Sequence, residues 1–375
     1  MSDFSEFVPE HIRKLGGYTP GKSLRQAQRE SRVKCIKLAS NESPFGPSPK
    51  AVAAMQAVLG EINFYPDNDA SELRQKLAEL HAVNPEQIVV TAGSTSLLGI
   101  ITRTLLAPGT NAVTSARSFI VYPIATKAAG AELIEVPMRE DGFDLDAILS
   151  AINRDSRMVF IANPNNPTGT LLTAEEVDRF LDRVPDHVIT ILDEAYCDFA
   201  QYFAEQRGVQ YSRSLDHVRS RKKVVVLRTF SKAHGLAGVR VGYGIGPTEL
   251  MSYFARMRTT FSVSVPAQAA ALAALDDAPH TERALANNAE QAAVVLAGLA
   301  ESGYKAVPTW ANFVYCDLGE DCSEIAKKLQ DEGVIIRPLG PWGAPRAIRV
   351  TIGTPEQNQI FLHAFRKVMA REAVK

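Results

Sequence analysis

The apolar residues of this chain fall into short runs that alternate with longer segments of mixed polarity. Runs rich in Val, Ile and Leu, which are typical of buried strands, occupy residues 88–91, 112–114, 132–136, 158–162, 188–192 and 223–228. Segments typical of helices occupy residues 51–59, 72–81 and 96–106. Strands that alternate with helices predict an α/β fold, in which helices cover both faces of a mainly parallel sheet.

The pattern changes in the last third of the chain. Residues 276–299 are rich in alanine and charged residues, which predicts a long helix leading out of the sheet domain. Shorter segments predict a compact α+β unit, at residues 304–307, 312–317, 323–331, 347–351 and 356–370. Because 375 residues are too many for one small core, we expect two domains. The large domain is residues 46–275, and the small one joins residues 276–375 to the N-terminal segment 1–45.

Composition and charge narrow the class of protein. The chain is 46% hydrophobic and 22% charged, which is ordinary for a soluble globular protein, and its formal net charge is -1. Such a balance provides no basic surface for nucleic acid or for an anionic membrane. No signal peptide or membrane-spanning run is present, and the four cysteines lack the spacing of a zinc site. We therefore expect a cytoplasmic protein that acts on small molecules without a metal.

A lysine stands in the loop just past the end of one predicted strand. Lys232 follows residues 223–228, and its apolar and small neighbours would partly desolvate the amine and lower its pKa. An amine of lowered pKa is a nucleophile that can condense with an aldehyde. The nearby Thr229, Ser231 and Arg240 offer two hydroxyls and a bidentate cation, a set that suits a phosphate monoester. A Ser-Lys pair alone is more typical of an ordinary protein surface, so the residues at the other strand ends decide whether Lys232 belongs to an active site.

Two more polar segments follow predicted strands. Gly93, Ser94 and Thr95 precede a predicted helix, whose free amides and positive dipole end attract anions, although a plain helix cap explains the loop equally well. Residues 163–169 read Asn-Pro-Asn-Asn-Pro-Thr-Gly, a rigid turn in which the Asn166 amide can donate to a phenolate oxygen.

An acidic segment ends a third strand. Asp193 closes the run 188–192, and a buried carboxylate there would need a partner such as a protonated ring nitrogen. Tyr196, three residues later, can bond a phenolate oxygen. A magnesium-binding acid is the alternative, but the chain has no phosphate-binding G-x-x-x-x-G-K-[ST] segment.

Two arginines lie in apolar surroundings near the C-terminus. Arg349 lies within the predicted strand 347–351, where its charge needs an anion; a substrate carboxylate or a structural ion pair would serve. Arg337 is a second such arginine. The glycine-rich segment 242–246 has the wrong spacing for a dinucleotide site, and we expect a close-packed turn beside the lysine loop.

Taken together, these motifs resemble the fold-type I aminotransferases that depend on pyridoxal 5'-phosphate (PLP), and most closely the histidinol-phosphate aminotransferases. The resemblance rests on Ser-Lys-Ala-x-Gly-Leu-Ala-Gly-x-Arg around Lys232, on residues 163–169 and on Asp-Glu-Ala-Tyr from Asp193, and it extends through nearly the whole chain. It implies a large domain with a mainly parallel seven-stranded sheet and a smaller α+β domain.

The resemblance also implies a role for each candidate residue. Lys232 carries PLP as a Schiff base, and its phosphate is held by Gly93, Ser94, Thr95, Thr229, Ser231 and Arg240. Asp193 pairs with the ring nitrogen, while Asn166 and Tyr196 contact the ring oxygen. Further assignments rest on the resemblance alone: Tyr122 stacks on the ring, Tyr65 reaches the neighbouring subunit's cofactor, Asn166 and Arg349 bind substrate, and Tyr18 and Arg337 contact the substrate phosphate.

The implied reaction converts L-histidinol phosphate and 2-oxoglutarate into imidazole-acetol phosphate and L-glutamate, a step of histidine biosynthesis, in a homodimer with shared active sites. Alternatives are an aromatic amino-acid aminotransferase and a threonine-phosphate decarboxylase. The chain departs from the family pattern at Ser43, Thr95, Ser96, His234, Thr259 and Thr260, which leaves these alternatives open. A PLP-binding transcriptional regulator would need a DNA-binding domain, and residues 1–45 contain no basic helix pair.

Overall fold

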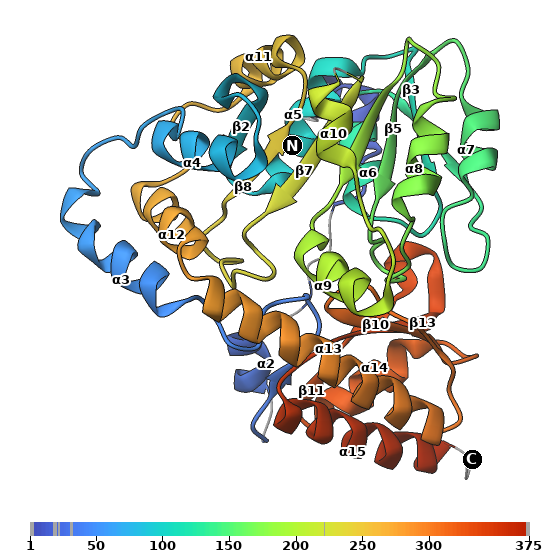
Figure 1. Cartoon of the computed structure of the whole chain (residues 1–375). Coiled ribbons are helices and arrows are strands. Elements are labelled where there is room, and N and C mark those ends of the chain that lie inside the picture. Colours follow the sequence, from blue (N-terminus) through green and yellow to red (C-terminus); the bar gives the residue numbers. More distant parts are fainter. Residues whose placement is uncertain (1–3, 18–20, 22, 31–32, 221, 373–375) are drawn as a thin grey trace.

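Two layered units lie side by side, joined by one long helix (Figure 1). The structure is a computed structural model that describes residues 4–17, 21, 23–30, 33–220 and 222–372. The first unit is built on a seven-stranded sheet and the second on a four-stranded sheet. Helix α13 (Ala278–Glu301) runs from the first unit across the second, as the alanine-rich segment predicts. The domain boundaries at residues 45 and 275 stay a proposal.

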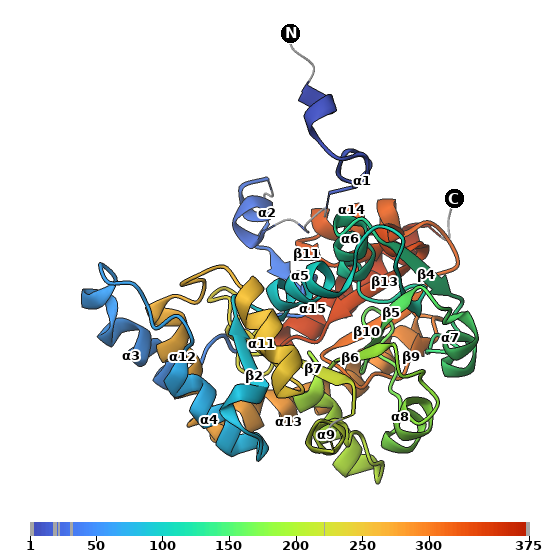
Figure 2. The ribbon, with the colours of Figure 1, turned by 90° about the horizontal axis from the view of Figure 1, so that it is seen from above.

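The seven-stranded sheet is mainly parallel, which confirms the predicted fold class. Its strand order is β2 (Ile88–Thr91), β8 (Gly242–Ile245), β7 (Val224–Thr229), β6 (Ile189–Asp193), β5 (Ser156–Ala162), β3 (Asn111–Ser115) and β4 (Glu132–Val136). Strand β8 runs antiparallel to both of its neighbours, and the other pairs are parallel. The central strands are buried because helices pack on both faces (Figure 2).

The prediction of a turn at residues 242–246 is wrong, because Gly242–Ile245 forms strand β8. The glycines serve close packing instead of a turn. A Cβ atom on Gly242 would lie 2.5 Å from the backbone nitrogen of Ser94, at the first residue of helix α5 (Ser94–Leu105). Strand β8 therefore supports the loop that begins this helix.

Helices surround the large sheet; α3, α4 and α5 lie at the three segments that the sequence pattern predicts, and the others were not predicted. Besides α5 they are α3 (Pro49–Ala57), α4 (Ser71–His81), α6 (Val121–Ala128), α7 (Leu145–Ala151), α8 (Ala174–Leu181), α9 (Cys197–Arg207), α10 (Ser214–Arg219), α11 (Thr248–Met257) and α12 (Val265–Leu275). Local caps begin several of them: the Ser48 side chain accepts a hydrogen bond from the Ala51 amide, and Thr173 and Glu176 form a capping box. No helix among the described residues is both long enough and apolar enough to cross a bilayer.

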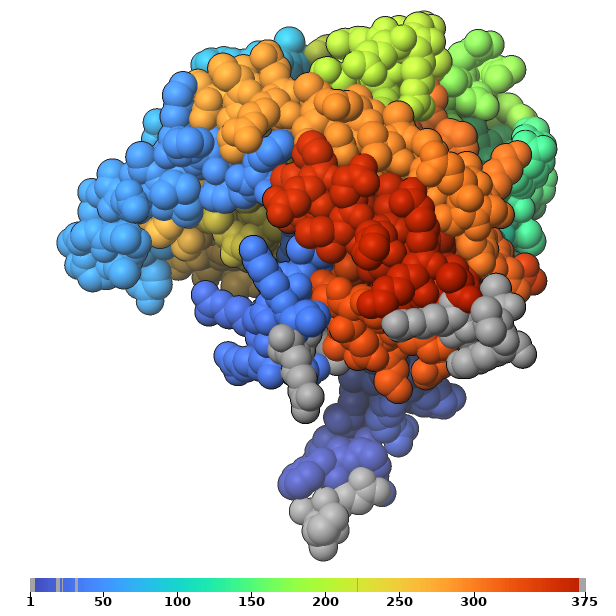
Figure 3. All heavy atoms as spheres, turned by 90° about the horizontal axis from the view of Figure 1, so that it is seen from below, coloured from blue at the N-terminus to red at the C-terminus, as the bar shows by residue number. Residues whose placement is uncertain are grey.

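The second unit has its own sheet and its own hydrophobic core. The strand order is β12 (Arg337–Leu339), β13 (Ala344–Thr351), β10 (Phe313–Asp317) and β9 (Ala306–Val307). Helices α13, α14 (Cys322–Asp331) and α15 (Pro355–Glu372) pack on it, with Val295, Phe361 and Phe365 fully buried between them. Figure 3 shows α13 and α15 side by side on the outer face of this unit.

The N-terminal segment joins the second unit through a short parallel pair. Strand β1 (Ile36–Lys37) lies in register with β11 (Val334–Ile335), so the chain passes the small unit before it enters the large one. Ahead of β1 lie the short helices α1 (Glu10–Arg13) and α2 (Leu24–Glu30), and α1 projects from the body (Figure 2). Residues 39–42, directly after β1, consequently lie where the two units meet.

Candidate active site

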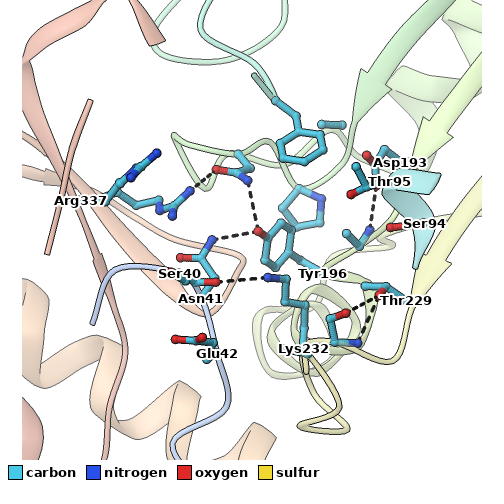
Figure 4. A pocket seen from close by; sticks show the side chains of 18 of the residues that line it. Ser40, Asn41, Glu42, Ser94, Thr95, Asp193, Tyr196, Thr229, Lys232 and Arg337 are labelled. Carbon is cyan, nitrogen blue, oxygen red and sulfur yellow. Dashed lines mark hydrogen bonds between the residues drawn. The ribbon is translucent and has the colours of Figure 1, made fainter. Parts of the chain in front are cut away.

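A cavity of about 280 Å³ lies between the carboxyl ends of the large sheet's parallel strands and the small unit. Ligands of such sheets bind at these strand ends. The cavity brings together most of the residues predicted from sequence: Ser94, Thr95, Asn166, Asp193, Tyr196, Thr229, Ser231, Lys232, Arg240, Arg337 and Arg349. Figure 4 shows Lys232, Asp193 and Tyr196 converging from the large unit, with Arg337 approaching from the small one.

Lys232 follows β7, and its amine points into the cavity (Figure 4). The Nζ atom donates to the Ser40 carbonyl at 3.3 Å and lies 5.6 Å from the centre of the Tyr196 ring. Burial lowers the pKa of Lys232 to about 8, the positive charge of Arg349 acts in the same direction, and the carboxylate of Glu42 opposes both. The neutral, nucleophilic amine is therefore accessible near neutral pH.

Asp193 is the last residue of β6, and its carboxylate is buried beside the cavity. Burial raises the pKa of this carboxyl to about 6, although the hydrogen bonds from Tyr122 and Ala195 hold it down. The Tyr122 hydroxyl donates to Oδ2 at 3.0 Å, and the Ala195 amide donates to Oδ1 at 3.3 Å. A buried carboxylate of this kind is stabilised by a cationic N–H partner.

The structure corrects the predicted role of Tyr122. Its side chain is 0% exposed and stacks on Phe160, with ring centres 4.7 Å apart and planes 6° apart, so neither ring face is open to the cavity. Phe119, three residues earlier and just ahead of α6, lines the cavity instead, and its ring meets Tyr122 edge-on at 5.6 Å. Sequence reasoning missed Phe119 because only packing decides which of two aromatic residues faces the cavity.

Hydroxyl and guanidinium groups gather at one end of the cavity. The Thr229 hydroxyl donates to Ser231 Oγ at 2.9 Å, and the Ser231 amide donates back to Thr229 Oγ1 at 3.1 Å. Gly93 has a φ of +89°, and a Cβ atom there would lie 2.5 Å from a terminal nitrogen of Arg240. With the helix that starts at Ser94, these groups form a compact set of donors that fits a phosphate.

A second set of hydrogen bonds connects the cavity wall to the small unit. Asn166 and Asn41 donate to the Tyr196 hydroxyl at 3.2 and 2.8 Å. The Arg349 guanidinium donates to Asn166 Oδ1 at 2.6 Å and to the Ala39 carbonyl at 2.8 Å. Asn41 was not predicted as a site residue; the signal that could have found it is the Asn-Glu-Ser-Pro loop at residues 41–44, which follows β1.

Two arginines approach the cavity from adjacent strands. Arg337 of β12 and Arg349 of β13 are directly opposite in the antiparallel register, so their side chains share one face of the small sheet. Both guanidiniums lie over the ring of Trp342, 5.0 and 5.8 Å from its centre. Sequence reasoning did not find Trp342, which lines the cavity. The arrangement presents two positive charges to an anionic ligand.

The remaining predicted residues lie elsewhere. Tyr65 is 82% exposed and stacks on Phe261 with ring centres 4.6 Å apart, outside this chain's own cavity. Tyr18 lies outside the described residues. Among the positions that depart from the family pattern, Thr95 lines the cavity and the others do not; His234 instead contacts the Thr281 hydroxyl at 3.4 Å behind the lysine loop.

The fold and the cavity together define a fold-type I PLP-dependent enzyme. Lys232 and Asp193 lie at strand ends of a mainly parallel sheet, and a smaller α+β unit lies beside this sheet. The sequence profile described as "Aminotransferase class I and II" matches residues 33–365. The chain belongs to this family.

Relatives and solved structures agree with this assignment. "Histidinol-phosphate aminotransferase 2" of Pseudomonas aeruginosa is 42% identical over 375 residues, covering 99% of this chain and 100% of that protein. The protein of the same name from Pseudomonas fluorescens is 43% identical over 372 residues, covering 98% and 99%. The crystal structure of a histidinol-phosphate aminotransferase from Sinorhizobium meliloti, in complex with pyridoxal-5'-phosphate, has a TM-score of 0.88 and 31% identity, with 99% of each chain covered.

Proposed function

We propose that this chain transfers the amino group of L-histidinol phosphate to 2-oxoglutarate, giving imidazole-acetol phosphate and L-glutamate. The observation that carries the proposal is the register pair of Arg337 and Arg349, which places two guanidiniums at the cavity that contains Lys232. Both substrates carry anionic groups that such a pair can bind. The names of the relatives support the same reaction. We place it in histidine biosynthesis in the cytoplasm.

The residues present fit PLP. The donors at Ser94, Thr95, Thr229, Ser231 and Arg240 would hold its phosphate, together with the backbone at Gly93. Asp193 would hold the ring nitrogen, Asn166 and Tyr196 the ring oxygen, and Phe119 would cover the ring in place of Tyr122. When bound, the cofactor supplies an aldehyde that condenses with amines and a ring that withdraws electrons from the substrate carbon.

The chain's own groups then divide the work. With a pKa of about 8, Lys232 Nζ exists in part as a free amine near neutral pH. It would accept a proton from the substrate carbon and deliver it to the former aldehyde carbon of the cofactor. The Asp193 carboxylate stabilises positive charge on the ring nitrogen in a water-poor site. Arg349 binds the carboxylate of 2-oxoglutarate or glutamate, and Arg337 binds the phosphate of histidinol phosphate, with Tyr18 as an added hydroxyl donor.

A homodimer with shared active sites is part of the proposal. The exposed stack of Tyr65 on Phe261 lies outside the chain's own cavity, and we infer that a second copy covers it. Tyr65 would then reach the phosphate of the neighbouring subunit's cofactor. Burial of two exposed aromatic rings would also contribute to association.

An aromatic amino-acid aminotransferase is the second candidate, because Phe119 and Trp342 give the cavity an aromatic wall. To distinguish the two, PLP-loaded protein is mixed separately with histidinol phosphate, phenylalanine and threonine phosphate, and loss of the cofactor's absorbance is followed. The proposal predicts the fastest loss with histidinol phosphate, and none in Lys232→Ala. A faster reaction with phenylalanine would favour the aromatic enzyme, and release of carbon dioxide from threonine phosphate would indicate a decarboxylase.

A further inference from the structure

We propose that the buried ion pair between Glu194 and Arg228 is a positioning device for the active site. It holds the end of β6, which carries Asp193, against the end of β7, which carries Thr229. The inference rests on the proposed cofactor-binding roles of Asp193 and Thr229, and it assigns a function to two residues that do not line the active-site cavity.

The pair is closely bonded and largely removed from solvent. Glu194 Oε2 accepts hydrogen bonds from Arg228 Nε at 3.1 Å and from Nη2 at 2.7 Å, while Oε1 accepts from the Ser212 hydroxyl at 2.7 Å. The side chains are 2% exposed for Glu194 and 18% for Arg228. The Glu194 amide also donates to the Leu227 carbonyl at 2.9 Å, so the side-chain link reinforces a backbone link between the two strand ends.

Position along the strands explains why this pair would act on the site. Glu194 directly follows Asp193, and Arg228 directly precedes Thr229. Successive side chains of extended backbone point to opposite sides. Asp193 and Thr229 line the active-site cavity, whereas Arg228, next to Thr229, lines a different cavity, of about 710 Å³. A shift of the backbone at either ion-pair residue would therefore move the adjacent site residue.

Charge couples the pair to Asp193 as well. The negative charge of Glu194 raises the pKa of Asp193, which also faces Tyr122, Lys232 and the Ala195 amide. Arg228 neutralises Glu194, and an isolated buried charge is strongly unfavourable.

The other titratable groups near the pair are Tyr211, Cys197, Asp198, Tyr243 and His81. Tyr243 lies opposite Arg228 in the sheet, and its hydroxyl bonds to His81 at 2.8 Å.

The test compares Arg228→Gln, Glu194→Gln and the double variant with the parent. Cofactor-free protein is titrated with PLP by absorbance at a series of pH values, which requires no knowledge of the amine substrate. In the parent we expect affinity to fall on the acid side as Asp193 becomes protonated. Arg228→Gln leaves Glu194 negative and unpaired, so the midpoint of this fall should move to higher pH by about 0.5–1 unit. At pH 7 this shift by itself should raise cofactor Kd by up to about twofold, with a larger rise at lower pH.

Glu194→Gln should move the midpoint to lower pH, because the negative neighbour is lost and a buried cation remains. The double variant should return it toward the parent value. Opposite shifts cannot result from a general loss of stability, which is measured separately as Tm. Lys367→Gln, which breaks a remote ion pair with Glu332, is the matched control and should move neither Kd nor midpoint.

Midpoints and Kd values equal to those of the parent, with only Tm lowered, would overturn the inference. If Arg228→Gln does not fold, Glu194→Gln decides alone: a downward shift supports the inference and an unchanged midpoint overturns it. Because the readout is cofactor binding, the result stands even if histidinol phosphate is not the substrate.

Discussion

Asp193 illustrates how a single residue's behaviour depends on two opposing effects. Burial destabilises its charged form and raises its pKa to about 6, whereas the Tyr122 hydroxyl stabilises the carboxylate. For the proposed mechanism the charged form is required, because it pairs with a cationic ring nitrogen. The hydroxyl of Tyr122 therefore extends the pH range in which the site is active.

Tyr122→Phe should shift the acid limb of kcat/KM to higher pH. Removing a hydrogen bond to a charged group destabilises the ionised Asp193 carboxylate by about 1.5 kcal/mol, so the pKa of Asp193 rises by about one unit. Activity should be lost as the pH falls through this raised pKa and should be near that of the parent above it. The check is a pH–rate profile, with Tyr315→Phe, a buried tyrosine of the small unit, as control. An unmoved acid limb would show that Tyr122 only packs.

Arg337 provides a test of substrate choice. Arg337→Leu removes a charge-assisted contact to a phosphate, worth about 1.5–3 kcal/mol, so KM for histidinol phosphate should rise tens-fold. Phenylalanine has no such bond to lose and should react as well as before. Steady-state kinetics with both amines check this, and Arg346→Leu, at an exposed arginine of the neighbouring strand β13, is the control. Equal effects on both amines would contradict the phosphate role.

Strand β8 shows how glycines within a strand can shape a site. Its glycines let the strand approach the start of α5, where the proposed phosphate-binding loop lies. At Gly242 the closest atoms are backbone atoms of Ser94 and Gly93 and the Arg228 carbonyl oxygen, which cannot yield easily. At Gly244 the closest atom is the tip of the Leu97 side chain, which can rotate away.

Gly242→Ala should therefore push the loop at Gly93 and Ser94 out of place. We expect the free energy of unfolding to fall by about 1–3 kcal/mol, as for other overpacked sites, and PLP Kd to rise about tenfold. Gly244→Ala is the matched control, with a smaller loss of stability and unchanged Kd. Denaturant unfolding and a PLP titration measure the two effects. Identical Kd values for both variants would argue against support of the loop by β8.

The whole molecule places its active site between two units, so neither unit contains the site alone. Asp193 and Lys232 come from the large sheet, while Arg337 and Arg349 come from the small one. Residues 39–42, between β1 and the large unit, close the cavity from the side. We propose that a second copy completes it with Tyr65.

Mixed dimers test the shared site directly. A dimer of one Lys232→Ala subunit and one Tyr65→Ala subunit contains one site with both residues intact, provided that Tyr65 serves the neighbouring subunit. This site should have the parent's KM and PLP Kd, whereas Tyr65→Ala homodimers should bind PLP about tenfold more weakly. Tyr253→Phe, another exposed tyrosine, is the control. If the mixed dimer has only the weak sites of the Tyr65→Ala homodimer, Tyr65 acts within its own subunit.

Much of the architecture follows from local sequence. Buried parallel strands require continuous apolar runs, and the predicted runs 158–162, 188–192 and 223–228 match β5, β6 and β7 to within one or two residues. Lys232, Asp193 and Asn166 stand within four residues of the ends of such runs, and carboxyl ends of parallel strands meet at one edge of the sheet. The convergence of these residues on one cavity was therefore predictable from their order along the chain.

Other features depend on contacts between distant segments, which periodicity does not contain. Phe119 and Tyr122 are both aromatic and lie three residues apart, and packing against Phe160 holds Tyr122 away from the cavity. In the sequence the glycines of β8 resemble a turn, because their close contact with the start of the helix at Ser94 exists only in the folded structure. Sequence by itself determined the strands and the chemistry at their ends. Tertiary structure decided which side chains face the cavity, because that choice depends on steric contact between segments far apart in the chain.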